Sequence, residues 1–179
     1  AITNKVAELG GAVIMPVMEV MDAGHMSIIQ DPTGAVVSLW QAKEHGGANT
    51  FNEHGALVWN ELLTRDVEKA RTFYADLLGW TYEEMDMGEM GTYCIIKVGE
   101  RSNGGIFPMG DDFPAEVPPH WMVYLGANDV DASAKQVTDL GGQIRVPPTD
   151  ISVGRFAVVS DPQGGTFTLF KGGDQTDME

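Results

Sequence analysis

Apolar residues recur along the chain with two different periods, and the two kinds of segment follow each other in a regular order. From residue 67 to residue 78 they return every three or four positions, which is typical of the buried face of a helix. The runs AVVSLW at 35–40 and GTFTLF at 165–170 alternate apolar with polar residues, as half-buried strands do. Helices that are followed by several strands indicate an α+β fold. The apolar helix positions are Val67, Ala70, Phe73, Tyr74, Leu77 and Leu78.

The segment 7–40 recurs later in the chain as the segment 138–170. Both copies carry a Leu-Gly-Gly motif near their start, at 9–11 and 140–142, and Asp-Pro-x-Gly before their last strand pattern, at 31–34 and 161–164. Glycine ends a helix well because it enters the left-handed conformation without a steric penalty. Proline and glycine in the second motif predict a tight turn. Each copy therefore predicts a helix end followed by three short strands.

A second repeat relates two predicted helices. Asp66 and Val67 match Asp129 and Val130, a separation of 63 residues (129 − 66). Each aspartate is placed to cap its helix by accepting hydrogen bonds from N–H groups of the first turn. The repeats divide the chain into three β-α-β-β-β units, the first without its opening strand and part of its helix. We expect 1–41 to be the C-terminal half of a truncated first module, 42–54 a linker, 55–171 a complete module of units 55–118 and 119–171, and 172–179 an acidic tail.

The charge of the chain limits its partners. Acidic residues outnumber basic ones by 26 to 11, so the formal net charge is −15. Such a surface repels phosphate backbones and anionic lipids, and we therefore expect neither nucleic acid nor membrane as a partner. No apolar run reaches the roughly 20 residues of a membrane helix, and no signal peptide is visible, which favours the cytoplasm. Cys94 is the single cysteine, which excludes an internal disulfide and a cysteine-cluster metal site.

These ordered motifs resemble the vicinal oxygen chelate superfamily, which includes glyoxalases, bleomycin-resistance proteins and extradiol dioxygenases. The resemblance is carried by LLTRDVEKARTFYADLLGW at 62–80 and by the two Asp-Pro-x-Gly strand patterns, and it is closest to two-module glyoxalase-like proteins of actinobacteria. It implies paired β-α-β-β-β units that form a curved mixed sheet around a cleft, here one complete module plus the C-terminal half of another. The missing half would come from a longer protein, of which this chain is a fragment, or from another chain, as in a homodimer paired along the open sheet edge.

Metal-dependent members of the superfamily hold a divalent cation with His, Gln or Glu. The resemblance places the opening-strand ligands at Trp59 and Met122, and the closing-strand ligands at Thr168 and Ser38. Indole has no lone pair to donate, thioether sulfur is soft, and hydroxyls are weak ligands. We therefore expect the complete module to lack the usual metal site and to carry no cofactor. A divalent metal held by other residues stays open.

Histidines are the remaining candidates for metal ligands. His120 is the best placed, because it lies two residues before Met122 and strand alternation gives both the same facing. The simpler interpretation is a histidine at the rim of the site that follows a pair of prolines. His25, His45 and His54 lie in a turn and in the predicted linker, where exposed polar roles are expected.

Glu61 is a candidate for catalysis without a metal. It lies two residues after Trp59 and shares its facing on the opening strand, with Leu63 continuing that face. Apolar surroundings would raise the pKa of the carboxyl group and suit it to act as a general base. The alternative is a carboxylate paired with Arg65, with Arg155 or with a backbone N–H.

Aromatic and thioether side chains near these positions favour ligand stacking. An ordinary core explains the same residues equally well. The principal hypothesis is a glyoxalase-like small-molecule-binding protein. The alternatives are a metal-dependent lyase or dioxygenase of the glyoxalase superfamily, and an interaction or structural protein assembled through the half module. The candidate ligand-binding residues are Trp59, Met122, Tyr124, Thr168 and Phe170.

Overall fold

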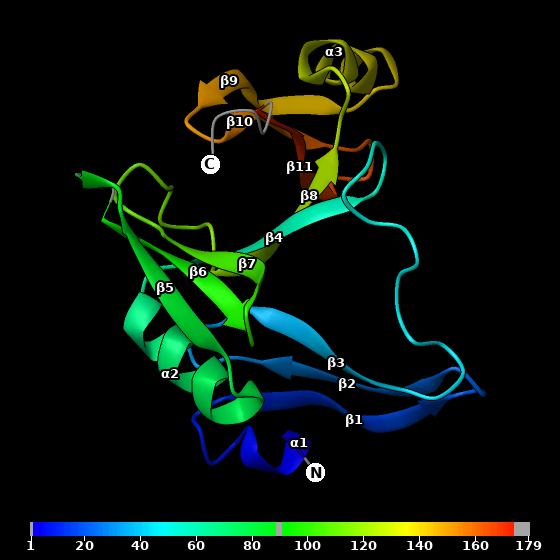
Figure 1. The fold of residues 1–179 in the computed structure, drawn as a ribbon, viewed down its shortest axis with the longest axis vertical. Helices are drawn as coiled ribbons and strands as arrows, with labels where there is room; N and C mark the ends of the chain where they lie inside the picture. Colours follow the sequence, from blue (N-terminus) through cyan, green and yellow to red (C-terminus); the bar gives the residue numbers. More distant parts are fainter. Residues whose placement is uncertain (1, 89–90, 174–179) are drawn as a thin grey trace. The chain divides into compact units, whose positions relative to one another are not determined.

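The computed structural model describes residues 2–88 and 91–173. These residues form the α+β fold that the sequence predicts (Figure 1). The helices are α1 (Ile2–Lys5), α2 (Val67–Leu78) and α3 (Val130–Asp139). The strands are β1 (Ala12–Val20), β2 (Gly24–Gln30), β3 (Val36–Ala42), β4 (Leu57–Thr64), β5 (Thr81–Asp86), β6 (Thr92–Val98), β7 (Arg101–Pro108), β8 (His120–Gly126), β9 (Gln143–Ile151), β10 (Gly154–Ser160) and β11 (Thr166–Gly172). Within the described ranges, no helix is long and apolar enough to cross a membrane.

The strands form two sheets. Strands β1, β2 and β3 make a three-stranded sheet in that order, and the others make a mixed sheet in the order β5-β6-β7-β4-β8-β11-β10-β9. The pairs β4–β7 and β8–β11 are parallel. In both cases the opening strand of a β-α-β-β-β series pairs with its closing strand. The two strands are parallel because the helix returns the chain to the end of the sheet at which the opening strand began, and the closing strand is the third of the strands that follow.

Contacts divide the chain into two compact units. Unit 1 comprises residues 1–48 and 61–121, and unit 2 comprises residues 49–60 and 122–179. The module boundaries stay a prediction. Within the predicted linker, His54 forms an isolated parallel bridge with Gly126 in unit 2. Most of the predicted acidic tail, residues 174–179, lies outside the described residues.

Helix α2 forms the centre of the core of unit 1. Its period places Ala70, Phe73, Tyr74 and Leu77 in the interior, as predicted, and Val67 and Leu78 pack partly against the same core. The helix packs against both the three-stranded sheet and the strands of the larger sheet that belong to unit 1 (Figure 1). The buried strand and turn residues around it are Ile29, Ala35, Leu62, Cys94, Ile96 and Ile106.

Both predicted aspartate caps are present. The Asp66 carboxylate accepts a hydrogen bond from the backbone N–H of Lys69 at 3.0 Å, and the Asp129 carboxylate accepts one from Ala132 at 2.9 Å. Helix α2 ends at Gly79, whose φ of 73° is the left-handed conformation that glycine adopts without strain. The caps fix where each helix begins and so where the preceding strand must end.

A buried network joins the first Asp-Pro-x-Gly turn to α2 inside unit 1. One carboxylate oxygen of Asp31 accepts hydrogen bonds from the backbone N–H groups of residues 33–35. The other accepts one from the Tyr74 hydroxyl at 3.0 Å, and Trp121 Nε1 donates to that hydroxyl at 3.1 Å. Burial, and then the nearby Asp31 carboxylate, raise the pKa of Tyr74. The turn is thereby held by a side chain 43 positions away in the sequence.

In unit 2, α3 covers one face of strands β9, β10 and β11 (Figure 1). Val130 and Ala134 of the helix pack on Ala157, Val159 and Leu169 of the strands. Because side chains alternate along a strand, the neighbours of these strand residues point to the face opposite α3. That opposite face carries most of the predicted ligand-binding residues.

Candidate functional site

Four of the predicted ligand-binding residues follow the strand alternation in unit 2. Leu169 packs against α3, so Thr168 and Phe170 on either side of it point to the opposite face. Thr168 of β11 pairs with Tyr124 of β8, so the two side chains point to the same face. Met122 lies two residues before Tyr124 on β8 and therefore points to that face as well. The rings of Tyr124 and Phe170 meet edge to face, with centroids 6.1 Å apart. Trp59 lies in β4 and is half-buried.

Thr168 carries the most unusual polar atom of this face. The side chain is 0% exposed, and its hydroxyl has no hydrogen-bond partner among the described residues. Met122 beside it is also buried, at 8% exposure. A buried hydroxyl without a partner costs about 1–3 kcal/mol, so it requires either a functional explanation or a compensating contact.

Glu61 lies on β4 in unit 1. Leu62 packs into the core around α2, so Glu61 and Leu63 point to the opposite face, and Glu61 is 8% exposed. The two arginines considered as its partners make other contacts. Arg65 donates to the backbone oxygens of Pro114 and Val117. Arg155 pairs with Asp131 and Asp150.

The sequence patterns missed one position in unit 1. Gly105 of β7 is the strand partner of Glu61, just as Thr168 of β11 is the strand partner of Tyr124. A Cβ built on Gly105 would collide with the hydroxyl and ring of Tyr93. Strand β7 is not preceded by an Asp-Pro-x-Gly turn, so the landmark that located Thr168 and Ser38 is missing there. The Gly-Gly pair at 104–105 was the available signal, since glycine inside a strand often marks a close approach.

His120, His54 and His45 make contacts that fit structural roles. His120 Nδ1 lies 2.8 Å from the Pro118 carbonyl oxygen and donates to it. His54 Nδ1 accepts from the backbone N–H of Asn128 at 3.3 Å, and the His45 ring contacts Trp40 edge-on. The Nδ1 of His25 is buried with no partner in the described part of the chain.

The donor set does not fit a divalent metal of the kind that the fold family implies. The expected positions in the complete module, Trp59, Met122 and Thr168, carry an indole, a thioether and a buried hydroxyl. None of these is a good ligand for a hard divalent cation. Across residues 2–88 and 91–173, no group of three or more His, Cys, Asp or Glu side chains is placed to hold a metal ion.

Ser38, the closing-strand position of the first half unit, lies on β3. It is exposed and pairs with Ile28 of β2. Its neighbour on the same face, Trp40, is 39% exposed and packs over Gly24. This face of the three-stranded sheet therefore carries a hydroxyl, two residues from an indole, where the resemblance places a ligand.

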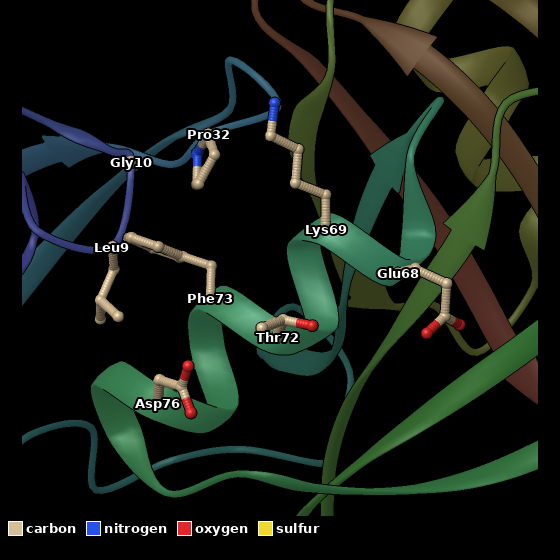
Figure 2. A pocket seen from close by; sticks show the side chains of 8 residues that line it. All are labelled: Leu9, Gly10, Pro32, Glu68, Lys69, Thr72, Phe73 and Asp76. Atoms are coloured by element: carbon tan, nitrogen blue, oxygen red, sulfur yellow. The ribbon is translucent and has the colours of Figure 1, made fainter.

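Two surface pockets lie away from the predicted site residues. The first, of about 360 Å³, belongs to unit 1. In Figure 2, Phe73 extends from α2 toward Leu9 and Gly10, Lys69 reaches toward Pro32, and Glu68 turns away. The second, of about 210 Å³, lies on the α3 side of unit 2. Its lining residues are His54, Gly55, Leu125, Gly126, Ala127, Ser133, Gln136, Val137, Leu140, Phe167 and Leu169.

Comparison with known proteins agrees with the fold. Residues 56–92 match the family described as bleomycin resistance protein-like N-terminal. The chain is 46% identical over 172 residues to the proteins named "Putative glyoxylase CFP32" of Mycobacterium tuberculosis and Mycobacterium bovis, covering 96% of this chain and 65% of theirs. It is 34% identical over 170 residues to the anthracycline biosynthesis protein DnrV of Streptomyces peucetius, covering 94% of this chain and 60% of that protein. The chain therefore spans less than two thirds of these relatives.

Solved structures share the fold at low sequence identity. The 2,3-dioxygenase LapB from Pseudomonas sp. KL28 has a TM-score of 0.61 at 17% identity, covering 99% of this chain and 69% of that chain. The 2,2',3-trihydroxybiphenyl 1,2-dioxygenase of Sphingomonas wittichii strain RW1 has a TM-score of 0.58 at 14% identity, with the same coverage. These likenesses concern the fold alone. The chain is similar in sequence to the relatives above, and its fold is that of the vicinal oxygen chelate superfamily.

Proposed function

We propose that this chain binds an apolar or aromatic small molecule on the sheet face of unit 2 opposite α3, without a metal ion. The contacts would come from the residues that share this face and from Trp59. They are Trp59, Met122, Tyr124, Thr168 and Phe170. Aromatic rings supply large stacking areas, and the flexible thioether of Met122 adapts to irregular ligand shapes.

The observation that carries the proposal is the buried hydroxyl of Thr168. It is 0% exposed and without a partner in the described residues, beside the edge-to-face pair of Tyr124 and Phe170. Because protein atoms cover this hydroxyl, a ligand reaches it only by displacing a side chain of this face, and it then satisfies the hydroxyl while stacking on the rings. An ordinary core position would be expected to carry valine instead.

The relatives suggest which compounds to test first. One group is named as a glyoxylase and another as anthracycline biosynthesis proteins, so a panel should combine small oxo acids with fused-ring aromatic compounds. The activity of the relatives is a proposal for this chain, because the chain covers 65% and 60% of their lengths.

Isothermal titration against such a panel tests the proposal. We expect at least one fused-ring aromatic compound to bind. We expect Thr168→Val to weaken that binding about tenfold, since one hydrogen bond to the ligand is lost. Thr166→Val is the matched control, because Thr166 lies on the same strand but is exposed. Absence of binding to every fused-ring aromatic compound would refute the proposal.

Metal analysis separates the binding role from a metal-dependent lyase or dioxygenase. We expect protein purified without chelators to carry less than stoichiometric Fe, Mn, Ni or Zn, and to bind the aromatic ligand equally well with chelator present. A stoichiometric metal that is needed for ligand binding would replace the proposal with the metal-dependent function.

A metal-free enzyme and an assembly role each make a distinct prediction. A metal-free enzyme with Glu61 as general base predicts a turnover that Glu61→Gln abolishes. A homodimer, or another assembly through the half module, predicts a particle mass above the 19.3 kDa of the chain, measured by size-exclusion chromatography with light scattering.

A further inference from the structure

The two copies of the internal repeat have the same strands but different surroundings. Strands β1, β2 and β3 of the first copy correspond to β9, β10 and β11 of the second, at separations of 131, 130 and 130 residues (143 − 12, 154 − 24 and 166 − 36). In both copies the aspartate of the Asp-Pro-x-Gly turn accepts hydrogen bonds from backbone N–H groups of the turn through its Oδ1. The helix-covered face of one copy can therefore be compared residue by residue with that of the other.

In unit 1 this face of the first copy is covered by α2. Phe73 of α2 extends toward Leu9 of the Leu-Gly-Gly motif (Figure 2). Tyr74 donates its hydroxyl to Oδ2 of Asp31 at 3.0 Å, and Asp31 is 3% exposed. Four apolar residues of the first copy belong to the core around α2 or pack against it. They are Val6, Leu9, Val37 and Leu39.

In unit 2 the counterparts of these four residues all line the pocket of about 210 Å³ on the α3 side, which we call the α3 groove. They are Val137, Leu140, Phe167 and Leu169. Leu140 is 69% exposed, whereas its counterpart Leu9 is half-buried.

The turn aspartates differ in the same sense. Asp161 is the counterpart of Asp31 and is half-buried. Its Oδ1 accepts from the backbone N–H groups of Gln163 and Gly165, but its Oδ2 has no hydrogen-bond partner in residues 2–88 and 91–173. The corresponding oxygen of Asp31 accepts from Tyr74. Within the described ranges, unit 2 therefore has no helix that covers its turn and groove as α2 does in unit 1.

We propose that the α3 groove and the Asp161 turn of unit 2 dock an amphipathic helix of the α2 kind, supplied by a further β-α-β-β-β unit. The helix carries an aromatic residue followed by tyrosine, as Phe73 and Tyr74 do in α2. The aromatic ring enters the groove beside Leu140, and the tyrosine hydroxyl donates to Oδ2 of Asp161. This surface lies on the α3 side of unit 2, opposite the proposed ligand site, so the inference does not depend on the proposed function.

A second copy of this chain is a poor source of that helix, because its own α2 is already in use. Phe73 and Tyr74 are 2% and 0% exposed in unit 1, so unit 1 would have to open before they could contact a neighbouring molecule. The mycobacterial relatives show that a further unit has room in proteins of this kind. The match covers 172 residues and 65% of each, so about 93 residues (172 / 0.65 − 172) lie outside it, more than the 63-residue repeat.

A helical peptide with the α2 sequence, residues 66–79, is the probe. Arg71→Lys and Ala75→Glu, joined by a side-chain lactam one turn apart, hold the peptide helical before it binds. Position 71 faces β5 rather than the first repeat copy, since Arg71 contacts Glu84 and Tyr82, so the lactam leaves the docking face free. We expect the full chain to bind this peptide with a micromolar dissociation constant in fluorescence anisotropy. Tyr74→Phe in the peptide should weaken binding about tenfold, because the hydrogen bond to Asp161 is lost.

Substitutions in the chain locate the docking surface. Leu140→Glu should weaken peptide binding at least about tenfold, because it brings a charge into an apolar contact. Val153→Glu is the matched control and should leave binding unchanged. Val153 is 57% exposed in the turn between β9 and β10, at the opposite end of these strands from Leu140. Both side chains are exposed, so neither substitution disturbs the core of unit 2.

Two results would overturn the inference. One is absence of binding at millimolar peptide, or binding that either Leu140→Glu or the peptide substitution Tyr74→Phe leaves unchanged. The other is a dimer of the chain in light scattering that Leu140→Glu dissociates, because a second copy would then occupy the surface.

Discussion

Replacing Thr168 by valine should make the protein more stable while weakening ligand binding. The hydroxyl is 0% exposed and without a partner in the described residues, so folding removes it from water without compensation. Such a loss costs about 1–3 kcal/mol. Valine has a similar shape, and burying its additional methyl group contributes up to about 0.8 kcal/mol more. We therefore expect Thr168→Val to raise the free energy of unfolding by about 2 kcal/mol.

Thr64→Val is the matched control for this measurement. Thr64 is likewise 0% exposed, but its hydroxyl accepts a hydrogen bond from the backbone N–H of Asp66 at 3.3 Å. Removing that acceptor should lower the free energy of unfolding by about 1 kcal/mol, so the two identical substitutions should have opposite signs.

Urea unfolding of the ligand-free protein, followed by circular dichroism and fluorescence, measures both variants. The slope against urea should stay constant, so that midpoint shifts report stability. A Thr168→Val variant that is less stable than wild type would show that the hydroxyl is satisfied in the folded protein. In that case the central support for the ligand site would be lost.

Three further side chains give outcomes that can be measured. Tyr74→Phe should destabilise the protein by about 1–3 kcal/mol in urea, because Asp31 loses a buried donor. Since the pKa of Tyr74 is raised on folding, wild-type stability should fall as the pH rises above about 10, the unfolded value, and Tyr74→Phe should flatten that decline. Cys94 is buried, and burial raises the pKa of its thiol. The thiol should therefore react with Ellman's reagent only as fast as the protein opens. Rapid labelling would contradict the burial of Cys94 in the core of unit 1. The Arg155 guanidinium holds the pKa of Asp131 below its ordinary value, so Arg155→Ala should raise it in a carboxyl NMR titration, and an unchanged value would show that the pair is absent in solution.

Local signals in the sequence predicted the parts of the fold that depend on neighbouring residues. The caps at Asp66 and Asp129 and the buried stripe of α2 are encoded within a few turns of helix, and both were confirmed. The Asp-Pro-x-Gly turns are equally local. The strand alternation at 165–170 is local as well: Leu169 is buried under α3, and its neighbours Thr168 and Phe170 point the other way.

Features that depend on strand register were not predictable in the same way. The approach of Tyr93 to Gly105 depends on how β6 pairs with β7, and that pairing shifts between Ile96 and Lys97. No pattern along a single strand reports such a shift. The bond between Asp31 and Tyr74 joins residues 43 positions apart and depends on how α2 packs in unit 1.

The packing of unit 1 has a consequence for a chain that is cut by a protease. Residues 48–55 are exposed and follow the three-stranded sheet, so a protease has access to the backbone there. The fragment before the cut would still share a core with α2 through Ile29 and Ala35, and the Asp31 carboxylate would still hold the Tyr74 hydroxyl. A nicked molecule should therefore run as two bands on a denaturing gel and as one particle in native chromatography. Peptide continuity between the first half unit and the rest is dispensable once the protein has folded.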